Sequence, residues 1–353
     1  MGSENDICDT RFSDEEFRGR FYEEALSLHG TMEQEFQPRL ERNKALCDIL
    51  LSLRQYKRYE KVFKCGSYTA WAIPSDFSEK PFLVHADFCK DRLCSMCVWR
   101  RSLKIFSQVS RVMDEIQSDY RFIFVTLTLR NVPSDELING LDHLNKAWNL
   151  FQTYSKVRKA FKGYFKALEI TRNTESEWKE WHPHLHIIYA VDKSYFTDSR
   201  QYISYKELRE LWMRALGVNY APQVFIENVK GEEAQTDTAD RAVSLGKAVA
   251  EVAKYALKTD DIFKGSTETK CRIVLTLTQA LKGRRLCAFG GIFKEVARKL
   301  KLDDLEDGDL TDQDKLRSDV HYLVVNCSWE VGVGFHYHLD KTVYTDLKRR
   351  KHK

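Results

Sequence analysis

The chain has 353 residues, 43% of them hydrophobic, which is enough to bury a substantial core in two or three domains. No apolar run approaches the roughly 20 residues that cross a bilayer, and the first residues lack a secretion signal. We therefore expect a soluble, cytoplasmic protein with no membrane partner. The formal charge is only +4, but residues 1–40 carry ten acids and four bases, so the rest of the chain is distinctly basic. A basic body suits a phosphate polymer as partner, although solvated surface charge explains it equally well.

The first predicted elements are helices. Residues 1–60 contain two amphipathic stretches, the second beginning near Pro38, and we assign them to an N-terminal helical region. A cysteine-rich segment at 65–97 and a basic helix at 98–117 follow. We group these as a second region, 61–117, a zinc-binding module with its basic helix.

Strand and helix patterns alternate through the third region, 118–262. The expected order is strand 121–129, helix 135–158, strand 163–171, polar turn 172–181, strand 184–191, helix 204–215, strand 223–229 and helix 239–258. With a hairpin at its centre, this order predicts an α+β fold whose helices pack on one face of an antiparallel sheet and leave the other face for a ligand. The remainder, 263–353, is a small C-terminal α/β region, with an acidic segment 303–314 that we expect to be a solvated loop.

Three cysteines of the second region lie within nine residues: Cys89, Cys94 and Cys97. Cys65 stands upstream, beside a glycine that lets backbone amides turn toward the sulfur. This set predicts tetrahedral Zn²⁺ held by four thiolates, and the odd total of nine cysteines also favours reduced thiols over disulfides. Buried free cysteines are the alternative, as expected for the five that are scattered. Basic residues flank the trio, which makes the module a candidate to hold duplex DNA.

Three histidines alternate in the segment 181–191, whose apolar pattern is typical of a buried strand. Alternate residues share one face of a strand, so His184 and His186 can direct two imidazoles at one divalent metal, with His182 at the entrance on the same side. Glu169, on the strand expected to pair with this one, faces the same metal if the register permits. Two or three ligands with open positions are typical of a catalytic metal; ordinary structural histidines are the alternative.

The last predicted helix of the third region places three chemically useful side chains along one edge: Glu251, Tyr255 and Lys258. A phenol has a pKa near 10, so it becomes a nucleophile only where a metal polarises the phosphate and a cation such as Lys258 favours phenolate. Together with the histidine strand, these residues predict phosphodiester cleavage through a tyrosine. The alternative is that Tyr255 is one of 16 ordinary tyrosines beside solvated helix charges.

Taken together, three segments resemble the HUH endonuclease superfamily in order and spacing, and within it the replication initiator (Rep) proteins of rolling-circle plasmids. Residues 124–128 resemble the first strand motif, 182–186 the metal motif and 251–258 the nucleophile motif. Residues 88–101 also resemble a segment that precedes the first motif in these initiators. The resemblance covers about 65–300 and implies an HUH-type central antiparallel sheet with flanking helices.

The resemblance implies a mechanism. Tyr255 attacks the scissile phosphate of a single-stranded origin segment, which leaves a 5′-phosphotyrosyl link and a free 3′-OH that primes synthesis. Glu251, four residues earlier, is implied to activate water when replication terminates, so that one active tyrosine suffices.

The resemblance also implies the cofactors and partners. The catalytic metal is expected to be Mg²⁺ or Mn²⁺ on His184 and His186, with Glu169 and His182 competing for the third position. The implied partners are plasmid origin DNA, with a single-stranded nick site and a duplex binding site, and the host helicase and polymerase. Residues 263–353 are the candidate region for origin or partner binding.

Two other readings compete with the initiator. An HUH relaxase or single-strand transposase uses the same chemistry, but the cysteine segment and the absence of a second tyrosine near Tyr255 favour an initiator. A non-enzymatic, zinc-containing DNA-binding regulator belongs to another class, and it predicts that Tyr255→Phe leaves every activity intact.

Overall fold

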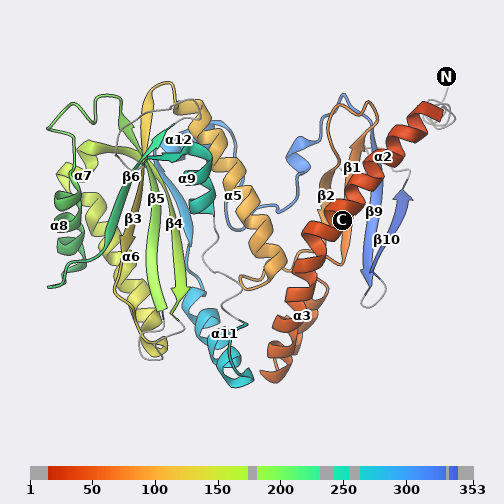
Figure 1. Ribbon diagram of the computed structural model, residues 1–353, viewed down its shortest axis with the longest axis horizontal. Coiled ribbons are helices and arrows are strands. Elements are labelled where there is room, and N and C mark those ends of the chain that lie inside the picture. The colour runs from red at the N-terminus through yellow and green to blue at the C-terminus, as the bar shows by residue number, and fades with distance from the viewer. Residues whose placement is uncertain (1–14, 174–180, 231–241, 254–262, 331–333, 341–353) are drawn as a thin grey trace. The chain divides into compact units, whose positions relative to one another are not determined.

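The computed structural model describes residues 15–173, 181–230, 242–253, 263–330 and 334–340 (Figure 1). The chain forms two compact units, one from residues up to Cys97 together with those from Asp309 on, and the other from Val98 to Gly308. Within the described ranges, no helix is both long and apolar enough to span a bilayer.

The unit from Val98 to Gly308 is built on a six-stranded sheet in the order β7-β6-β3-β5-β4-β8. All neighbours are antiparallel except β6 and β7, which are parallel. The strands are β3 (Tyr120–Thr128), β4 (Phe161–Arg172), β5 (Trp181–Asp192), β6 (Val224–Lys230), β7 (Ala242–Ser244) and β8 (Cys287–Gly291). The predicted α+β class with a central antiparallel sheet is confirmed, as are the four predicted strands of this region.

Helices cover both faces of this sheet, so the expectation of one bare face is wrong (Figure 1). Trp148 of α6 packs on Tyr189 with ring centres 6.4 Å apart, and Phe293 of α12 packs on Phe122 at 6.2 Å. Phe122 pairs with Ala190, the neighbour of Tyr189, so the two contacts lie on opposite faces. The reason is the unbroken apolar run from Ile187 to Val191, which places apolar side chains on both faces of β5. All five residues are inaccessible to solvent. Among the described residues of this unit the helices are α5 (Ser95–Ile116), α6 (Leu137–Thr153), α7 (Ser155–Ala160), α8 (Tyr205–Leu216), α9 (Leu245–Ala253), α11 (Thr267–Leu281) and α12 (Ile292–Lys299), with a 3₁₀ turn at Ser134–Glu136.

Two predicted helices differ from the observed ones. The helix expected at 135–158 is interrupted at Tyr154, which has extended backbone (φ −63°, ψ 132°) between α6 and α7. The helix expected at 239–258 begins only at Leu245, because β7 precedes it and pairs with β6. Its last part, from residue 254, lies outside the described residues.

The acidic segment is not simply solvated. Glu306 is buried, and its carboxylate accepts hydrogen bonds from the backbone N–H groups of Leu286 (2.5 Å) and Cys287 (3.0 Å). The expectation of a solvated loop is therefore wrong at this residue, because two backbone donors at the start of β8 compensate the buried charge.

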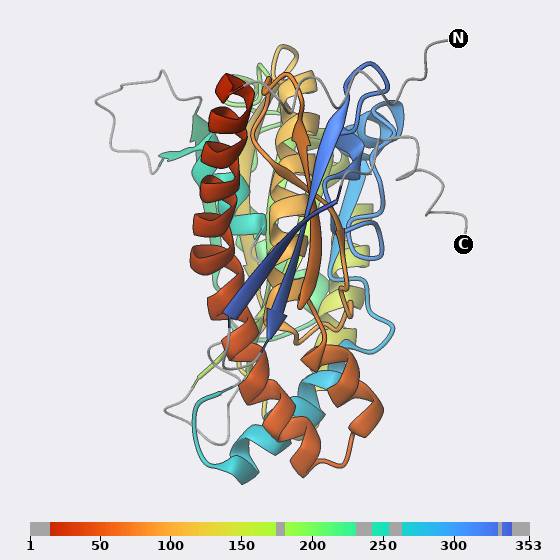
Figure 2. The same ribbon diagram turned by 90° about the vertical axis from the view of Figure 1, so that its right-hand side faces the viewer.

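The other unit combines a long helix with a four-stranded antiparallel sheet (Figure 2). Its helical run passes from α2 (Glu15–Thr31) through a π turn (Met32–Phe36) into α3 (Gln37–Ser52), followed by α4 (Tyr56–Phe63). The sheet order is β10-β9-β1-β2, with β1 (Tyr68–Pro74), β2 (Phe82–Ala86), β9 (Tyr322–Glu330) and β10 (Gly334–Asp340), and a 3₁₀ turn at Gln313–Lys315.

The helical run packs on the sheet through its π turn. Met32 and Phe36 are fully buried, and the Phe36 ring meets that of Trp71 on β1 edge-on, with centres 5.7 Å apart. Pro38 follows directly in the first turn of α3. Pro38 lacks an N–H, and the π turn directly before α3 joins it to α2, so the two predicted helical stretches form one continuous run.

Candidate functional site

Glu169, His184 and His186 meet on one face of the six-stranded sheet. In the β4–β5 pair Glu169 lies directly opposite His184, and the two-residue period of β5 brings His186 onto the same face. Glu169 Oε2 is 2.8 Å from His184 Nε2 and 2.7 Å from His186 Nε2. All three residues are buried, so the site is a buried polar cluster on this face of the sheet.

The other nitrogen of each ring has its own partner. His184 Nδ1 lies 3.1 Å from the carbonyl oxygen of His182, and His186 Nδ1 lies 3.1 Å from Thr126 Oγ1. A carbonyl oxygen only accepts, so His184 donates from Nδ1 and its neutral ring carries a lone pair at Nε2. That lone pair faces a carboxylate oxygen. A cation or an extra proton is therefore needed between the two atoms.

The electrostatics favour an ionised carboxylate. Burial opposes the charge on Glu169, but where the Nε2–H groups of His184 and His186 donate to it, these hydrogen bonds outweigh burial and hold the pKa of Glu169 well below its usual range. A cation that takes the place of these protons meets one negative oxygen and two ring nitrogens. Phe124 stacks on His186 with ring centres 5.5 Å apart and shields it from water.

These three residues could hold a divalent ion, since their ligand atoms all lie within 4.8 Å of one another. Two ligands at right angles on an ion with bonds of about 2.1 Å lie about 3.0 Å apart. The observed oxygen–nitrogen separations of 2.7 and 2.8 Å are close to that value. The donor set therefore fits an ion with nitrogen and oxygen ligands.

His182 occupies a different position. Its Nδ1 lies 2.7 Å from Asn131 Oδ1, and its ring centre is 5.2 Å from that of His184. Burial and the charge of His184 lower the pKa of His182. Of the two residues expected to compete for the third ligand position, the geometry favours Glu169.

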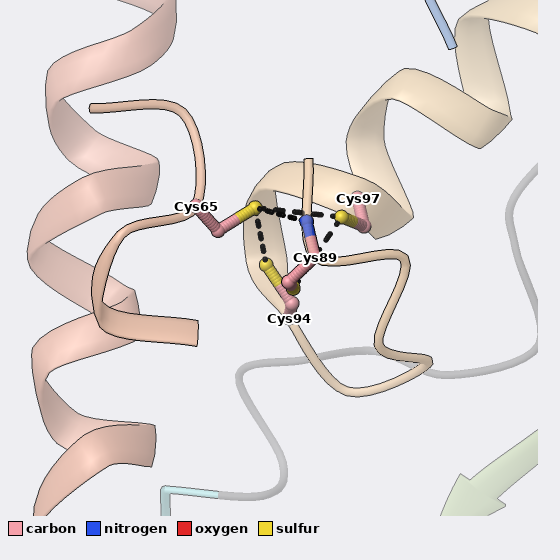
Figure 3. Close-up of side chains that lie close together, drawn as sticks. All are labelled: Cys65, Cys89, Cys94 and Cys97. Atoms are coloured by element: carbon pink, nitrogen blue, oxygen red, sulfur yellow. Dashed lines mark hydrogen bonds between the residues drawn. The ribbon is translucent and has the colours of Figure 1, made fainter. Parts of the chain in front are cut away.

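The structure brings the four expected cysteines together (Figure 3). Cys65 follows α4, Cys89 lies in the loop after β2, and Cys94 and Cys97 lie at the start of α5. The Cys65 sulfur is 3.4 Å from that of Cys94 and 3.5 Å from that of Cys97, and Cys89 and Cys97 are 3.7 Å apart. Zn–S bonds of about 2.3 Å directed at tetrahedral corners place sulfurs about 3.8 Å apart, so the cluster fits zinc.

Backbone amides point at these sulfurs, as expected where thiolates are bound. The N–H groups of Cys89 and Lys90 donate to Cys65 and Cys97 at 3.3 and 3.2 Å. Lys90 adopts positive φ (57°) to make this turn, and Gly66 does so beside Cys65 (78°).

The cluster also stabilises negative charge on sulfur. Burial opposes ionisation of Cys94, but hydrogen bonds from the other three thiols outweigh it and hold the pKa of Cys94 well below its usual value. Four thiols arranged to stabilise one thiolate are a favourable site for a dication, which ionises every thiol it binds.

Two basic residues beside the cysteines are less available for contact with DNA than expected. Arg100 and Arg101 are both buried, and Arg101 Nε donates to the backbone oxygen of Glu306 at 3.2 Å. Sequence proximity therefore misled the expectation for these two guanidinium groups, because the helix directs them into the protein rather than toward DNA.

The nucleophile helix is described only in part. α9 contacts β4, β5 and β6 and lies on the same side of the sheet as α12, which is the side of the histidines (Figure 1). Ala248, Val249 and Val252 are buried, as the predicted apolar stripe requires, and Glu251 is half-buried. Tyr255 and Lys258 lie outside the described residues.

Sequence reasoning missed three polar residues that support these sites. Thr126 holds His186, Asn131 holds His182, and the buried Asn43 donates from Nδ2 to the Cys94 sulfur at 3.1 Å while its Oδ1 accepts from the Ser95 N–H at 2.9 Å. Of the three, only Thr126 had a signal in the sequence, because Thr126 and Thr128 place hydroxyls at alternate positions of an otherwise apolar strand.

A family model described as "Replication protein" matches residues 80–333. The chain belongs to the replication protein family. This confirms the family expected from the motifs. The matched span of this replication protein contains the Glu169, His184 and His186 cluster and three of the four clustered cysteines; Cys65 precedes it.

Curated relatives of this replication protein agree. A "Protein rep" of a Bacillus species is 38% identical over 263 residues, which cover 72% of this chain and 84% of the relative. One of Bacillus amyloliquefaciens is 37% identical over 264 residues (72% and 76%), and one of Lactiplantibacillus plantarum is 36% identical over 265 residues (74% and 80%). No solved structure matches the chain.

Proposed function

We propose that this protein initiates rolling-circle replication of a plasmid as a metal-dependent, sequence-specific nickase and strand transferase for single-stranded origin DNA. The observation that carries the proposal is the buried cluster of Glu169, His184 and His186 on the sheet face that α9 contacts. Membership of the replication protein family supports the biological role. Such an initiator acts in the cytoplasm with the host helicase and polymerase.

Each residue of the cluster has a role in this chemistry. Glu169, His184 and His186 hold Mg²⁺ or Mn²⁺, which when bound polarises the scissile phosphate and stabilises its developing charge. Thr126 and the carbonyl of His182 fix the two imidazoles so that both present Nε2. Phe124 keeps water from the His186 ring.

Tyr255 is the proposed nucleophile. Its oxygen forms a bond to phosphorus while the bond from phosphorus to the 3′ oxygen breaks, and the leaving 3′ oxygen takes up a proton to become the primer hydroxyl. Lys258, one turn beyond Tyr255 in the predicted helix, favours the phenolate. At termination Glu251 takes a proton from water, and the water oxygen attacks the scissile phosphate of the regenerated origin, which frees a second 3′-OH. That 3′-OH attacks the phosphotyrosyl phosphorus, so the circle closes and the tyrosine leaves with a proton.

The four cysteines bind a structural Zn²⁺ in this proposal. With four protein ligands the ion has no open position, so it stabilises the fold around α4 and the start of α5 and takes no part in cleavage.

Cleavage of labelled single-stranded origin oligonucleotides with Mn²⁺ or with chelator, resolved on a denaturing gel, tests the proposal. Wild type is expected to give a metal-dependent covalent adduct, which Tyr255→Phe abolishes while Tyr205→Phe, an exposed tyrosine on α8, retains it. Glu251→Ala is expected to nick but to release replicated circles poorly. Duplex binding without an adduct on any origin would instead support the DNA-binding regulator.

A further inference from the structure

A pocket of about 440 Å³ opens at the end of the sheet that carries the candidate metal site. Its walls come from the end of β3, the beginning of β5 and the loop between α8 and β6. The volume lies within the range of about 300–1,000 Å³ that is typical of small-molecule sites. The lining side chains that matter for its chemistry are Arg130, Asn131, Asn173, His182, Tyr220 and Gln223.

The pocket adjoins the metal site directly. Thr128 lines the pocket and lies opposite His184 in the β3–β5 pair. His182 also lines the pocket, and its ring centre is 5.2 Å from that of His184. A nucleotide next to a phosphate bound at the metal site is therefore within reach of this pocket.

The pocket offers a fixed aromatic ring beside a permanent cation. The guanidinium carbon of Arg130 lies 5.5 Å from the centre of the Tyr220 ring, and the Arg130 backbone N–H donates to the Tyr220 hydroxyl at 3.4 Å. Proteins that bind single strands use this combination, because the ring stacks on a base and the cation attracts the backbone phosphates. No carboxylate is among the described residues that line the pocket.

Amide side chains complete the lining. Asn131, Asn173 and Gln223 provide donors and acceptors of the kind that pair with base edges. Asn131 is held in place by His182 at 2.7 Å.

The walls are also fixed before any ligand binds. Thr128 Oγ1 donates to the Gln223 carbonyl at 2.8 Å, and the Leu129 N–H donates to the Pro183 carbonyl at 3.2 Å. A site already held in shape loses little conformational entropy when a ligand enters.

We propose that this pocket binds one base of the single-stranded DNA, the base adjacent to the phosphate at the metal site. Tyr220 stacks on the base, Arg130 attracts the backbone, and Asn131, Asn173 and Gln223 select the base by its edge. This assignment rests on the proposed nicking function for the identity of the DNA. It makes the pocket a specificity-determining subsite of the same reaction.

Binding in the absence of metal tests the pocket separately from cleavage. A single-stranded oligonucleotide is selected from a random pool on the full-length wild-type protein in chelator, and its affinity is measured by fluorescence anisotropy. Copies with an abasic site at each position in turn are then compared. In wild type an abasic site at one of these positions is expected to lower the affinity about tenfold, which is the size of one lost base–aromatic stack.

Three variants locate that position in the pocket. Tyr220→Ala is expected to bind the intact oligonucleotide about tenfold more weakly than wild type does. Its affinity should fall no further when the sensitive position is made abasic. Tyr220→Phe keeps the ring and the wild-type profile. Tyr205→Ala is the matched control, since Tyr205 also lies under a guanidinium, that of Arg209 at 5.6 Å, but does not line the pocket. Its profile should equal that of wild type.

A folded Tyr220→Ala protein with the wild-type abasic profile would overturn the proposal, as would a selected pool without base preference at any position. If thermal melting shows that Tyr220→Ala is unfolded, Tyr220→Leu, which keeps apolar bulk without a π face, replaces it with the same expected result. If the protein nicks DNA but fails this test, only the assignment of the pocket is wrong. If it passes this test but never forms an adduct, only the proposed nicking function is wrong.

Discussion

Thr126 Oγ1 lies 3.1 Å from Nδ1 of His186, on the side of the ring away from Glu169. A group in this position fixes the ring and determines which nitrogen is available to a metal. Thr126→Val keeps the shape of the side chain but removes the hydroxyl, and we expect it to weaken Mn²⁺ binding by about 10–100-fold. Titration calorimetry measures this, and Thr126→Ser should restore the affinity.

Thr128→Val is the matched control for that change. It removes a hydroxyl from the same strand, but one that donates to the Gln223 carbonyl and not to a histidine. Equal losses of Mn²⁺ affinity in the Thr126 and Thr128 variants would mean that Thr126 acts only through the stability of β3.

Glu169→Gln should abolish stabilisation of the protein by Mn²⁺. An ion that binds only the folded state raises the free energy of unfolding by about 2.7 kcal/mol at a concentration of 100 Kd. The amide keeps the volume of Glu169 but removes the charge, so we expect no metal-dependent shift in denaturant midpoint. Glu227→Gln, on the same sheet face opposite Phe124, should keep the full shift. A full shift in Glu169→Gln would exclude the carboxylate as a ligand.

Cys94→Ser should remove the zinc, whereas Cys327→Ser should not. Cys94 lies inside the four-sulfur cluster, and Cys327 is a buried thiol whose pKa burial raises to about 12, so it stays neutral. Metal analysis is expected to find about one zinc per chain in wild type and Cys327→Ser, and none in Cys94→Ser. Both variants lose stability, so zinc content, not melting temperature, decides. Zinc-free folded wild type would contradict the site.

The local part of these sites could be read from the sequence because it follows from periodicity. The two-residue period of β5 is enough to place His184 and His186 on one face. Glu169 required more, since it meets them only in the register in which it lies opposite His184, and a shift by one residue would have turned it to the other face.

The remaining contacts come from pairings that no local pattern encodes. Asn43 reaches Cys94 across 51 residues, and Trp71 of β1 pairs with Val325 of β9 near the other end of the chain. The buried Arg101 was misjudged for the same reason, because its partner is the backbone of Glu306. Such contacts depend on how elements pack, which the order of residues along one element does not specify.

Lys166 should make the stability of the protein depend on pH in the alkaline range. Its side chain is buried on β4, with Nζ 5.2 Å from the Trp148 ring centre. Burial lowers the pKa of Lys166 to about 8, although Cys287 and Glu306 oppose the shift. Between about pH 8 and pH 10.4 the unfolded chain holds a proton that the folded protein has released, so the free energy of unfolding rises with pH through this window.

The gain is about 3 kcal/mol when the whole shift is realised. Lys166→Met lacks the amine, so we expect it to be more stable than wild type at pH 7, by a margin that shrinks toward pH 10. Urea unfolding at several pH values measures the difference, in which other titrating groups common to both proteins cancel. Lys162→Met on the same strand, which removes an amine paired with Asp192 at 2.9 Å, leaves Lys166 intact and should keep the wild-type rise. A margin that stays constant from pH 7 to pH 10 would show that Lys166 is charged in the folded protein throughout, and that the interaction with Trp148 and the two acidic neighbours outweighs its burial.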